Sequence, residues 1–296
     1  MAIEIIVTLI FLGSISGCTF SQHDKNKDDK SSINAQVDTF LFPGIEYLLP
    51  SPSEVLLTTL TEDISYTQNL TAPLGIEKKS VLSHFQALIL GVYITDLSYH
   101  IMFHEHQAST SCLASLRELS ESIGIGSDLY YEYFKRVEDN SNNIDSIDVI
   151  FRDFSQNAFL TIENTGNKEL LSLVALGSGI EAMYLSYKLI DFKTISKRLL
   201  PNFIGQRVIF ENYYKNFLNY NHSKPELHYL LQDMKNIYSL FGRNVAKKNN
   251  TTISKIKDSH FDINDRIENT YDEKAIKELG DSIVIVRNNL INQKYQ

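Results

Sequence analysis

Three side chains that could ligate a metal ion follow one another at four-residue intervals. Asp96, His100 and His104 recur at i, i+4 and i+8, so one continuous helix would line them along a single face. Two histidines one turn apart, together with a carboxylate, are able to ligate zinc. The segment Phe103–His106 lacks the HExxH spacing of metalloproteases. A core aspartate bonded to a tyrosine, with both histidines at the edge of the core, explains the same pattern. We therefore expect no metal and no cofactor, and keep His100 and His104 as weak candidate ligands.

Two carboxylates each interrupt a long apolar segment. Asp96 lies within Leu82–Phe103, and Glu181 lies within Leu170–Ile190. Both segments are apolar nearly all round, which predicts two helices at the centre of a bundle. An unpaired ionised carboxylate in a core is costly, so each acid needs a partner or a raised pKa. We expect a buried polar centre formed by Asp96, Glu181, Tyr99 and Tyr184. The candidate partners of the two acids are Tyr99, Tyr184, His100 and Arg207.

The surroundings of the two acids resemble each other. Leu90–Tyr99 and Leu176–Tyr187 both contain Leu-Gly, an isoleucine, an acid and then Leu-Ser-Tyr. The acid follows Gly91 by five residues and Gly177 by four, so the register slips by one. The glycines would allow a close backbone approach. A decayed internal repeat and a chance similarity between two apolar helices both explain the pattern.

No arrangement of nucleophile and base is evident in the sequence. Leu176–Gly179 does not match the G-x-S-x-G elbow of hydrolases, and no strand is expected before it. The phosphate-binding motif G-x-x-x-x-G-K-[ST] is absent from the sequence. We predict no catalytic residue. A ligand-binding or enzymatic domain centred on Asp96 and Glu181 remains the alternative.

A different chemistry is indicated at Cys18. It follows Ile15-Ser16-Gly17 and the apolar run Ile5–Leu12, which is too short to span a bilayer because a span needs about 20 apolar residues. This pattern predicts a lipoprotein signal peptide over residues 1–17, with the Cys18 sulfur taking lipid. Glu4 departs from the pattern, since the first residues carry no Lys or Arg. The alternative is a buried N-terminal helix with an ordinary core cysteine.

The residues after Cys18 favour the lipoprotein interpretation. Thr19–Asn34 is rich in Ser, Gln, Asn, Lys and Asp, and such a stretch buries too little surface to offset its ordering entropy. We predict that residues 18–39 form the lipidated cysteine and a flexible tether. Thr19 stands where an aspartate would resemble an inner-membrane retention signal. The expected location is therefore the outer membrane, on its periplasmic or external face.

Bulk composition limits the remaining classes of function. The formal net charge is −8, which argues against a nucleic-acid partner because such proteins carry a basic stripe. Hydrophobic content of 43% and charged content of 22% suit a globular domain. The chain has two cysteines, so lipidation of Cys18 leaves Cys112 without a disulfide partner. We expect Cys112 to be a buried, inert thiol.

Helical periodicity dominates the rest of the chain. We predict a single all-α domain over residues 40–296, arranged as a helical bundle or as an array of antiparallel helix pairs. Asn249–Asn269 is polar and rich in Lys and Asp, and we predict a long loop there with a short extended piece at Ile253–Ile256. The helices are expected at Lys78–Gln107, Thr110–Ser122, Ser127–Asp139, Ile144–Glu163, Lys168–Asp191, Lys193–Tyr220, Pro225–Asn244 and Asp272–Asn292.

Three segments carry a resemblance to a known family. Asp96-Leu97-Ser98-Tyr99, Gly179–Tyr184 and the helix start Ser51-Pro52-Ser53-Glu54 are similar to signature segments of all-helical Bacteroidetes lipoproteins of unknown function. The resemblance covers about Ser51 to Ile190. It implies a helical domain on a lipid anchor, and it carries no activity. We therefore expect a non-enzymatic lipoprotein that binds a protein partner or scaffolds an assembly in the cell envelope.

Overall fold

The computed structural model describes residues 55–56, 64–79, 82–125, 127–140, 143–189, 199–243, 246–255, 261–270 and 273–295. The predicted signal peptide, Cys18 and the tether all lie outside the described residues. The chain divides into two compact units, Met1–Phe42 and Pro43–Gln296, and everything described below belongs to the second unit.

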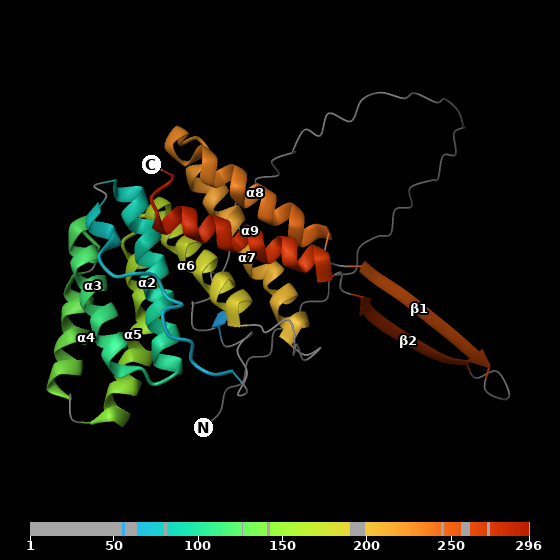
Figure 1. The fold of residues 1–296 in the computed structure, drawn as a ribbon, viewed down its shortest axis with the longest axis horizontal. Coiled ribbons are helices and arrows are strands. Elements are labelled where there is room, and N and C mark those ends of the chain that lie inside the picture. The colour runs from blue at the N-terminus through green and yellow to red at the C-terminus, as the bar shows by residue number, and fades with distance from the viewer. Residues whose placement is uncertain are drawn as a thin grey trace, which may run out of the picture. The chain divides into compact units, whose positions relative to one another are not determined.

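The expected all-α fold is confirmed, because the described core is built from helices (Figure 1). Short 3₁₀ turns at Ile76–Lys79 (η1) and Pro225–Leu227 (η2) precede two of the helices. The helices are α2 (Ser83–Met102), α3 (His106–Ile123), α4 (Ser127–Asp139), α5 (Ile144–Asn164), α6 (Lys168–Leu189), α7 (Leu199–Asn221), α8 (His228–Arg243) and α9 (Glu273–Ile291).

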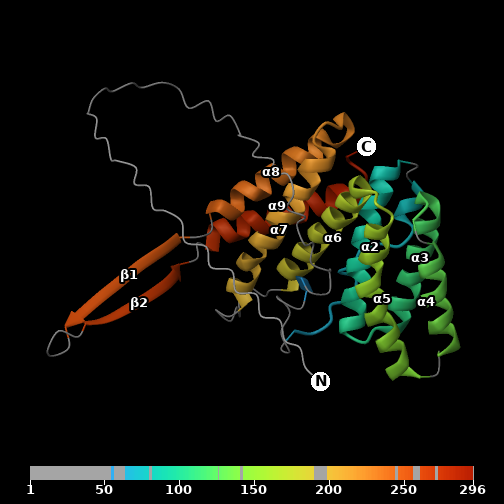
Figure 2. The ribbon, with the colours of Figure 1, turned by 180° about the vertical axis from the view of Figure 1, so that it is seen from behind.

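Helices α2 and α6 form the most extensive helix pair and divide the bundle into two groups. Helices α3 and α5 pack against α2, with α4 packed on both of them. Helices α7 and α9 pack against α6, with α8 packed on both of those. Figures 1 and 2 show the two groups on opposite sides of the central pair. Each group therefore begins with one of the two apolar helices that the sequence places at the centre.

The crossing of α2 and α6 depends on two glycines. A Cβ atom on Gly91 would lie 1.9 Å from the Val174 carbonyl oxygen, and one on Gly177 would lie 2.0 Å from the Leu88 carbonyl oxygen. Gly91 thus approaches Val174, three positions before Gly177, and Gly177 approaches Leu88, three positions before Gly91. The contact is therefore reciprocal. This close backbone approach was expected from the sequence.

Burial on all sides distinguishes the two central helices from the others. In α2 every residue from Ala87 to His100 is buried, and in α6 every residue from Ser172 to Tyr187 is buried. Helix α6 is long and apolar enough to cross a membrane, but 89% of its apolar window is buried inside the protein. A core helix meets the same criterion, and the packing of α2 and α7 around α6 identifies it as one.

The helix predicted over Lys78–Gln107 is wrong at both ends. Helix α2 begins at Ser83 and ends at Met102, and α3 starts at His106. His104 adopts a left-handed backbone with φ of 58°, and the Glu105 N–H donates to the His100 carbonyl at 2.9 Å. This is the hydrogen bond of a Schellman cap, which ends a helix by bonding back across its last turn. No glycine or proline marks the break in the sequence.

The long loop predicted over Asn249–Asn269 is also wrong. Strands β1 (Ala246–Lys255) and β2 (Phe261–Thr270) pair as an antiparallel hairpin, with Ile253 opposite Ile263. The extended piece expected at Ile253–Ile256 falls partly within β1. The polar composition hid the strands, because backbone ladder bonds form without an apolar face.

Candidate functional site

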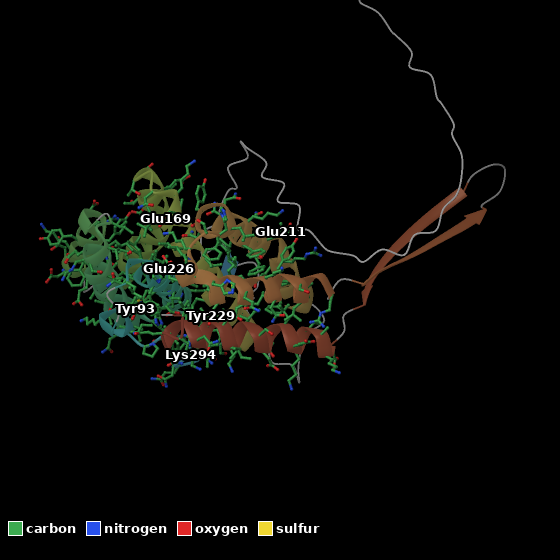
Figure 3. The ribbon with its side chains drawn as sticks, turned by 90° about the horizontal axis from the view of Figure 1, so that it is seen from above. Tyr93, Glu169, Glu211, Glu226, Tyr229 and Lys294 are labelled. Atoms are coloured by element: carbon green, nitrogen blue, oxygen red, sulfur yellow. The ribbon has the colours of Figure 1, made fainter. Side chains whose placement is uncertain are left out.

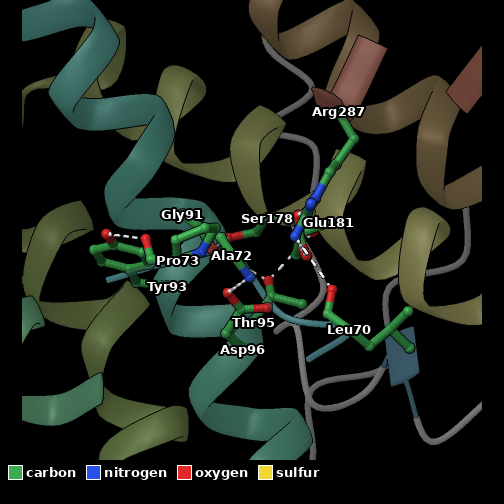
Figure 4. A network of polar contacts seen from close by, with 10 residues as sticks. All are labelled: Leu70, Ala72, Pro73, Gly91, Tyr93, Thr95, Asp96, Ser178, Glu181 and Arg287. Atoms are coloured by element: carbon green, nitrogen blue, oxygen red, sulfur yellow. Dashed lines mark hydrogen bonds and ion pairs between the residues drawn. The ribbon is translucent and has the colours of Figure 1, made fainter. Parts of the chain in front are cut away.

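The two carboxylates of the central helices lie together in the core. Asp96 follows Gly91 by about one and a half turns, and Glu181 follows Gly177 by about one turn. Because the two helices touch at these glycines, both acids emerge beside the crossing (Figure 4). The exposed fraction is 1% for Asp96 and 0% for Glu181. The expectation of a buried polar centre containing both acids agrees with this geometry.

Arg287 on α9 holds the Glu181 carboxylate with a two-pronged contact. Its Nε donates to Glu181 Oε2 at 2.9 Å, and its Nη2 donates to Oε1 at 2.9 Å (Figure 4). Nη2 also donates to the Leu70 carbonyl oxygen at 3.3 Å, and the guanidinium carbon lies 4.2 Å from the centroid of the Tyr184 ring. A bidentate guanidinium–carboxylate pair fixes geometry as well as charge. Arg287 is 4% exposed, so this ion pair is inside the protein.

The expected cation partner, Arg207, was the wrong arginine. Arg207 lies partly exposed on α7, whereas Arg287 comes from the last helix. A signal for Arg287 was present in the sequence, because it follows Ile283 by four residues and precedes Leu290 by three. Both of these are buried on the apolar face of α9, so the arginine stands on a buried stripe.

Asp96 has a different set of partners. The Ala72 N–H donates to Asp96 Oδ2 at 2.9 Å, whereas the buried Oδ1 accepts no hydrogen bond. Burial raises the pKa of Asp96 well above its ordinary value, and the neighbouring Glu181 raises it further. Arg287 and the Ala72 N–H oppose this shift without cancelling it. A protonated Asp96 would donate from its carboxyl group toward Glu181, which would use the otherwise unsatisfied oxygen.

The charges of the centre balance only with one proton bound. Two ionised carboxylates and one guanidinium leave a net charge of −1 in a buried site, which is costly in a low dielectric. One proton on Asp96 makes the centre neutral. Burial alone would lower the pKa of Arg287, but Glu181 and Asp96 more than offset this and raise it. Arg287 is therefore the fixed positive charge, and Asp96 is the carboxyl group whose neutral form the site favours.

Tyr184 and Tyr99, both expected in the centre, have different roles. Tyr184 lies under the Arg287 guanidinium and belongs to the centre. Tyr99 does not bond Asp96; its hydroxyl accepts from the Thr67 N–H at 2.9 Å and donates to the Thr67 carbonyl at 3.4 Å. The expected bond between a core aspartate and a tyrosine is therefore wrong, since Asp96 accepts from the backbone N–H of Ala72 instead.

The predicted row of Asp96, His100 and His104 does not form. Helix α2 ends before His104, which is exposed and outside the helix. His100 is buried, its Nδ1 lies 3.4 Å from the Tyr66 hydroxyl, and burial lowers its pKa to about 4. Within the described ranges, no group of three or more His, Cys, Asp or Glu residues could hold a metal ion.

Cys112 is buried, as expected. Its exposed fraction is 1%, and its thiol donates to the Tyr93 carbonyl at 3.3 Å. Cys18 lies outside the described residues.

A second polar network lies nearer the surface, where Asp153 of α5 accepts from Tyr133 and Arg136 of α4 and from Asn157. Other ion pairs join exposed or partly exposed side chains, such as Glu169 with Lys224 and Glu211 with Lys215, and Figure 3 labels the two glutamates. Pairs of this kind contribute about 0–1 kcal/mol each. Large exposed apolar side chains such as Tyr229 and Val208 are distributed over several helices. The Asp96–Glu181–Arg287 centre differs from these groups because its charged side chains are buried.

A comparison with known proteins found no matching family model, no matching curated protein and no matching solved structure.

Proposed function

We propose that this chain is a lipid-anchored protein of the outer membrane whose helical domain docks a protein partner or scaffolds an envelope assembly, without catalysis. The proposal of an anchor is supported by Cys18, by the small residues before it and by the polar stretch after it. The resemblance of Ser51–Ile190 to Bacteroidetes lipoproteins supports a helical domain on a lipid anchor. The net charge of −8 disfavours a nucleic-acid partner.

The proposal that the domain has no catalytic role rests on the burial of the charged centre and on the protein groups bound to it. Both oxygens of Glu181 are bound by Arg287, and Asp96 is bound by a backbone N–H. The exposed fraction of these three side chains is 4% or less. A catalytic acid must come within hydrogen-bond reach of its substrate, and here Arg287 occupies both oxygens of Glu181 while the second oxygen of Asp96 is buried away from solvent. The centre instead joins α2, α6 and α9, which is a structural task.

The anchor is tested by replacing the two cysteines separately. Cys18→Ser should abolish lipid labelling and release the protein from the envelope membranes into the soluble fraction. Cys112→Ser is the matched control, because serine keeps a donor for the Tyr93 carbonyl and leaves the proposed lipidation site intact. If Cys18→Ser stays in the membrane fraction, or if Cys112→Ser loses the label instead, the anchor is elsewhere.

The docking role is tested by cross-linking in intact envelopes, with two variants that separate the domain from the tether. A carrier protein fused after residues 1–39 should be anchored but capture no partner. Gly205→Ala should capture the same partner as the native protein, because a Cβ there meets nothing within 4 Å. Capture by the tether fusion would assign binding to the tether. Specific binding of a metal or small molecule that Asp96→Asn abolishes would favour the enzymatic or ligand-binding alternative.

A further inference from the structure

An extended segment before α2 is held to the bundle by side chains that bind its backbone. We call residues 64–76 the strap. Leu70, Ala72 and Ile76 are its buried side chains, with exposed fractions of 5–7%. The backbone of the strap is bound by side chains of α2, by Arg287 of α9 and by Gln293, which follows α9. These contacts join Tyr99 to Thr67, Arg287 to Leu70, Asp96 to Ala72, Tyr93 to Pro73 and Gln293 to Ile76.

Two of these contacts come directly from the charged centre. Asp96 accepts from the Ala72 N–H, and Arg287 donates to the Leu70 carbonyl (Figure 4). The strap therefore lies over the centre, where its backbone is hydrogen-bonded to two of the centre's side chains. When the strap leaves, Asp96 and Arg287 lose these bonds and gain water. The protonation of the centre and the position of the strap are thus linked.

We infer that the strap is a releasable latch, closed over the Asp96–Glu181–Arg287 centre while that centre holds one proton and loosened when the proton is lost. Three geometric observations support this. The closed centre is neutral only with a proton, Asp96 Oδ1 has no other hydrogen-bond partner, and the opposite oxygen of the same carboxyl group holds the strap. Losing the proton leaves a net negative charge under the strap.

The charged groups around Asp96 come from three elements. Glu181 on α6 raises the pKa of Asp96, and Arg287 on α9 lowers it. The Asp96 carboxylate in turn raises the pKa of Tyr184 of α6 and that of Tyr66 of the strap. Glu105, the N-cap residue of α3, raises the pKa values of Tyr66 and Tyr99. The buried side chains described on α3 and α5, which also pack on α2, carry no charge.

The sign of the pH dependence follows from the raised pKa of Asp96. In the open state Asp96 meets water and has its ordinary pKa near 3.8. Above that pH Asp96 gives the closed state one more proton than the open state, which makes closing less favourable as the pH rises. His100 faces Tyr66 of the strap and burial lowers its pKa to about 4, so below its ordinary pKa of 6.5 it would gain a proton in the open state and oppose the effect of Asp96. Above this range the closing equilibrium should fall about tenfold per pH unit until the pH passes the raised pKa of the closed state.

The test is hydrogen exchange of the strap amides in the full-length protein in detergent. The protection of the Ala72 amide, corrected for the pH dependence of intrinsic exchange, is measured upward from about pH 6.5, where His100 no longer titrates in the open state. In the native protein, protection should fall by up to about tenfold per pH unit below the raised pKa of Asp96 and become constant above it, while amides within α8 should not follow this change. Native protection that does not change with pH would overturn the inference.

Two variants separate the proton from the other strap contacts. Asp96→Asn presents an amide oxygen to Ala72 and an amide donor toward Glu181, so it imitates the protonated form and should give pH-independent protection. Tyr93→Phe removes the bond to the Pro73 carbonyl, so it should lower protection equally at every pH and leave the slope unchanged. An Asp96→Asn protein that keeps the native slope would overturn the inference.

A direct measurement on the native protein covers the case in which Asp96→Asn does not fold. Infrared spectroscopy should show the C=O band of a protonated, buried carboxyl group throughout the pH range in which strap protection falls, and the band should disappear at the pH where protection stops falling. No such band in that range, or a band that disappears while protection is still falling, would overturn the inference.

Discussion

Replacing Gly91 by alanine should separate the two central helices and destabilise the whole domain. The new Cβ would lie 1.9 Å from the Val174 carbonyl oxygen and 2.7 Å from the Ser178 nitrogen, both of which are backbone atoms that cannot rotate away. Helices α2 and α6 must move apart by about 1 Å to restore an ordinary contact. This movement strains two hydrogen bonds across the crossing: Ser178 Oγ donates to the Gly91 carbonyl at 2.9 Å, and Thr95 Oγ1 donates to the Ser178 carbonyl at 3.3 Å.

The size of the effect follows from three contributions. Each hydrogen bond contributes about 1 kcal/mol. Overpacking of a well-packed core costs about 1–3 kcal/mol. Replacing glycine by alanine inside a helix returns about 1 kcal/mol. The net destabilisation should be about 2–4 kcal/mol, which lowers the melting temperature by roughly 5–15 °C in a domain of this size.

Thermal unfolding followed by far-ultraviolet circular dichroism measures this effect. Gly205→Ala in α7 is the matched control, because it gains the same helix propensity and its Cβ meets nothing within 4 Å. It should raise the free energy of unfolding by about 0.5–1 kcal/mol. Combining Gly91→Ala with Gly177→Ala should cost less than the two single changes added together, since one separation of the helices relieves both clashes. If Gly91→Ala melts like Gly205→Ala, the description of the crossing is wrong.

The remaining predictions concern the charged centre. Arg287→Leu should destabilise the domain by about 3–5 kcal/mol in denaturant unfolding, because it leaves Glu181 buried without a counter-charge. The double variant with Glu181→Leu should recover part of that loss, and equal stability of the single and double variants would argue against the ion pair. Asp96→Ala should cost about 1–3 kcal/mol by leaving the Ala72 N–H unsatisfied. Asp96→Asn should cost less, and equal melting of both variants and the native protein would show that this hydrogen bond does not contribute to stability.

The fold class and the location of the centre were accessible to sequence reasoning because they depend on local patterns. Apolar residues all round Leu82–Phe103 and Leu170–Ile190 predict two central helices, and the structure buries both. A lone acid in the middle of each requires compensation wherever the helix packs. The glycines that precede the acids indicated a close approach, and the helices meet at these residues.

The breaks in the pattern were less accessible. His104 ends α2 in a left-handed conformation, which non-glycine residues adopt only when surrounding contacts compensate. The hairpin of β1 and β2 depends on backbone pairing between a polar β1 and a β2 in which only Phe261, Ile263 and Ile267 fall on alternate positions, so the strand period is weak in the sequence.

The partners of the two acids were decided by the tertiary structure alone. Glu181 and Arg287 are 106 positions apart, and Asp96 and Ala72 are 24 apart. Arg207 and Arg287 both stand on amphipathic helices, and only the packing of α9 against α6 brings the second to Glu181. The backbone of the strap becomes a partner because it crosses the centre. Local sequence thus determined that two charges would be buried, whereas the arrangement of distant elements determined which groups neutralise them, since electrostatic and hydrogen-bond contacts depend on distance in space.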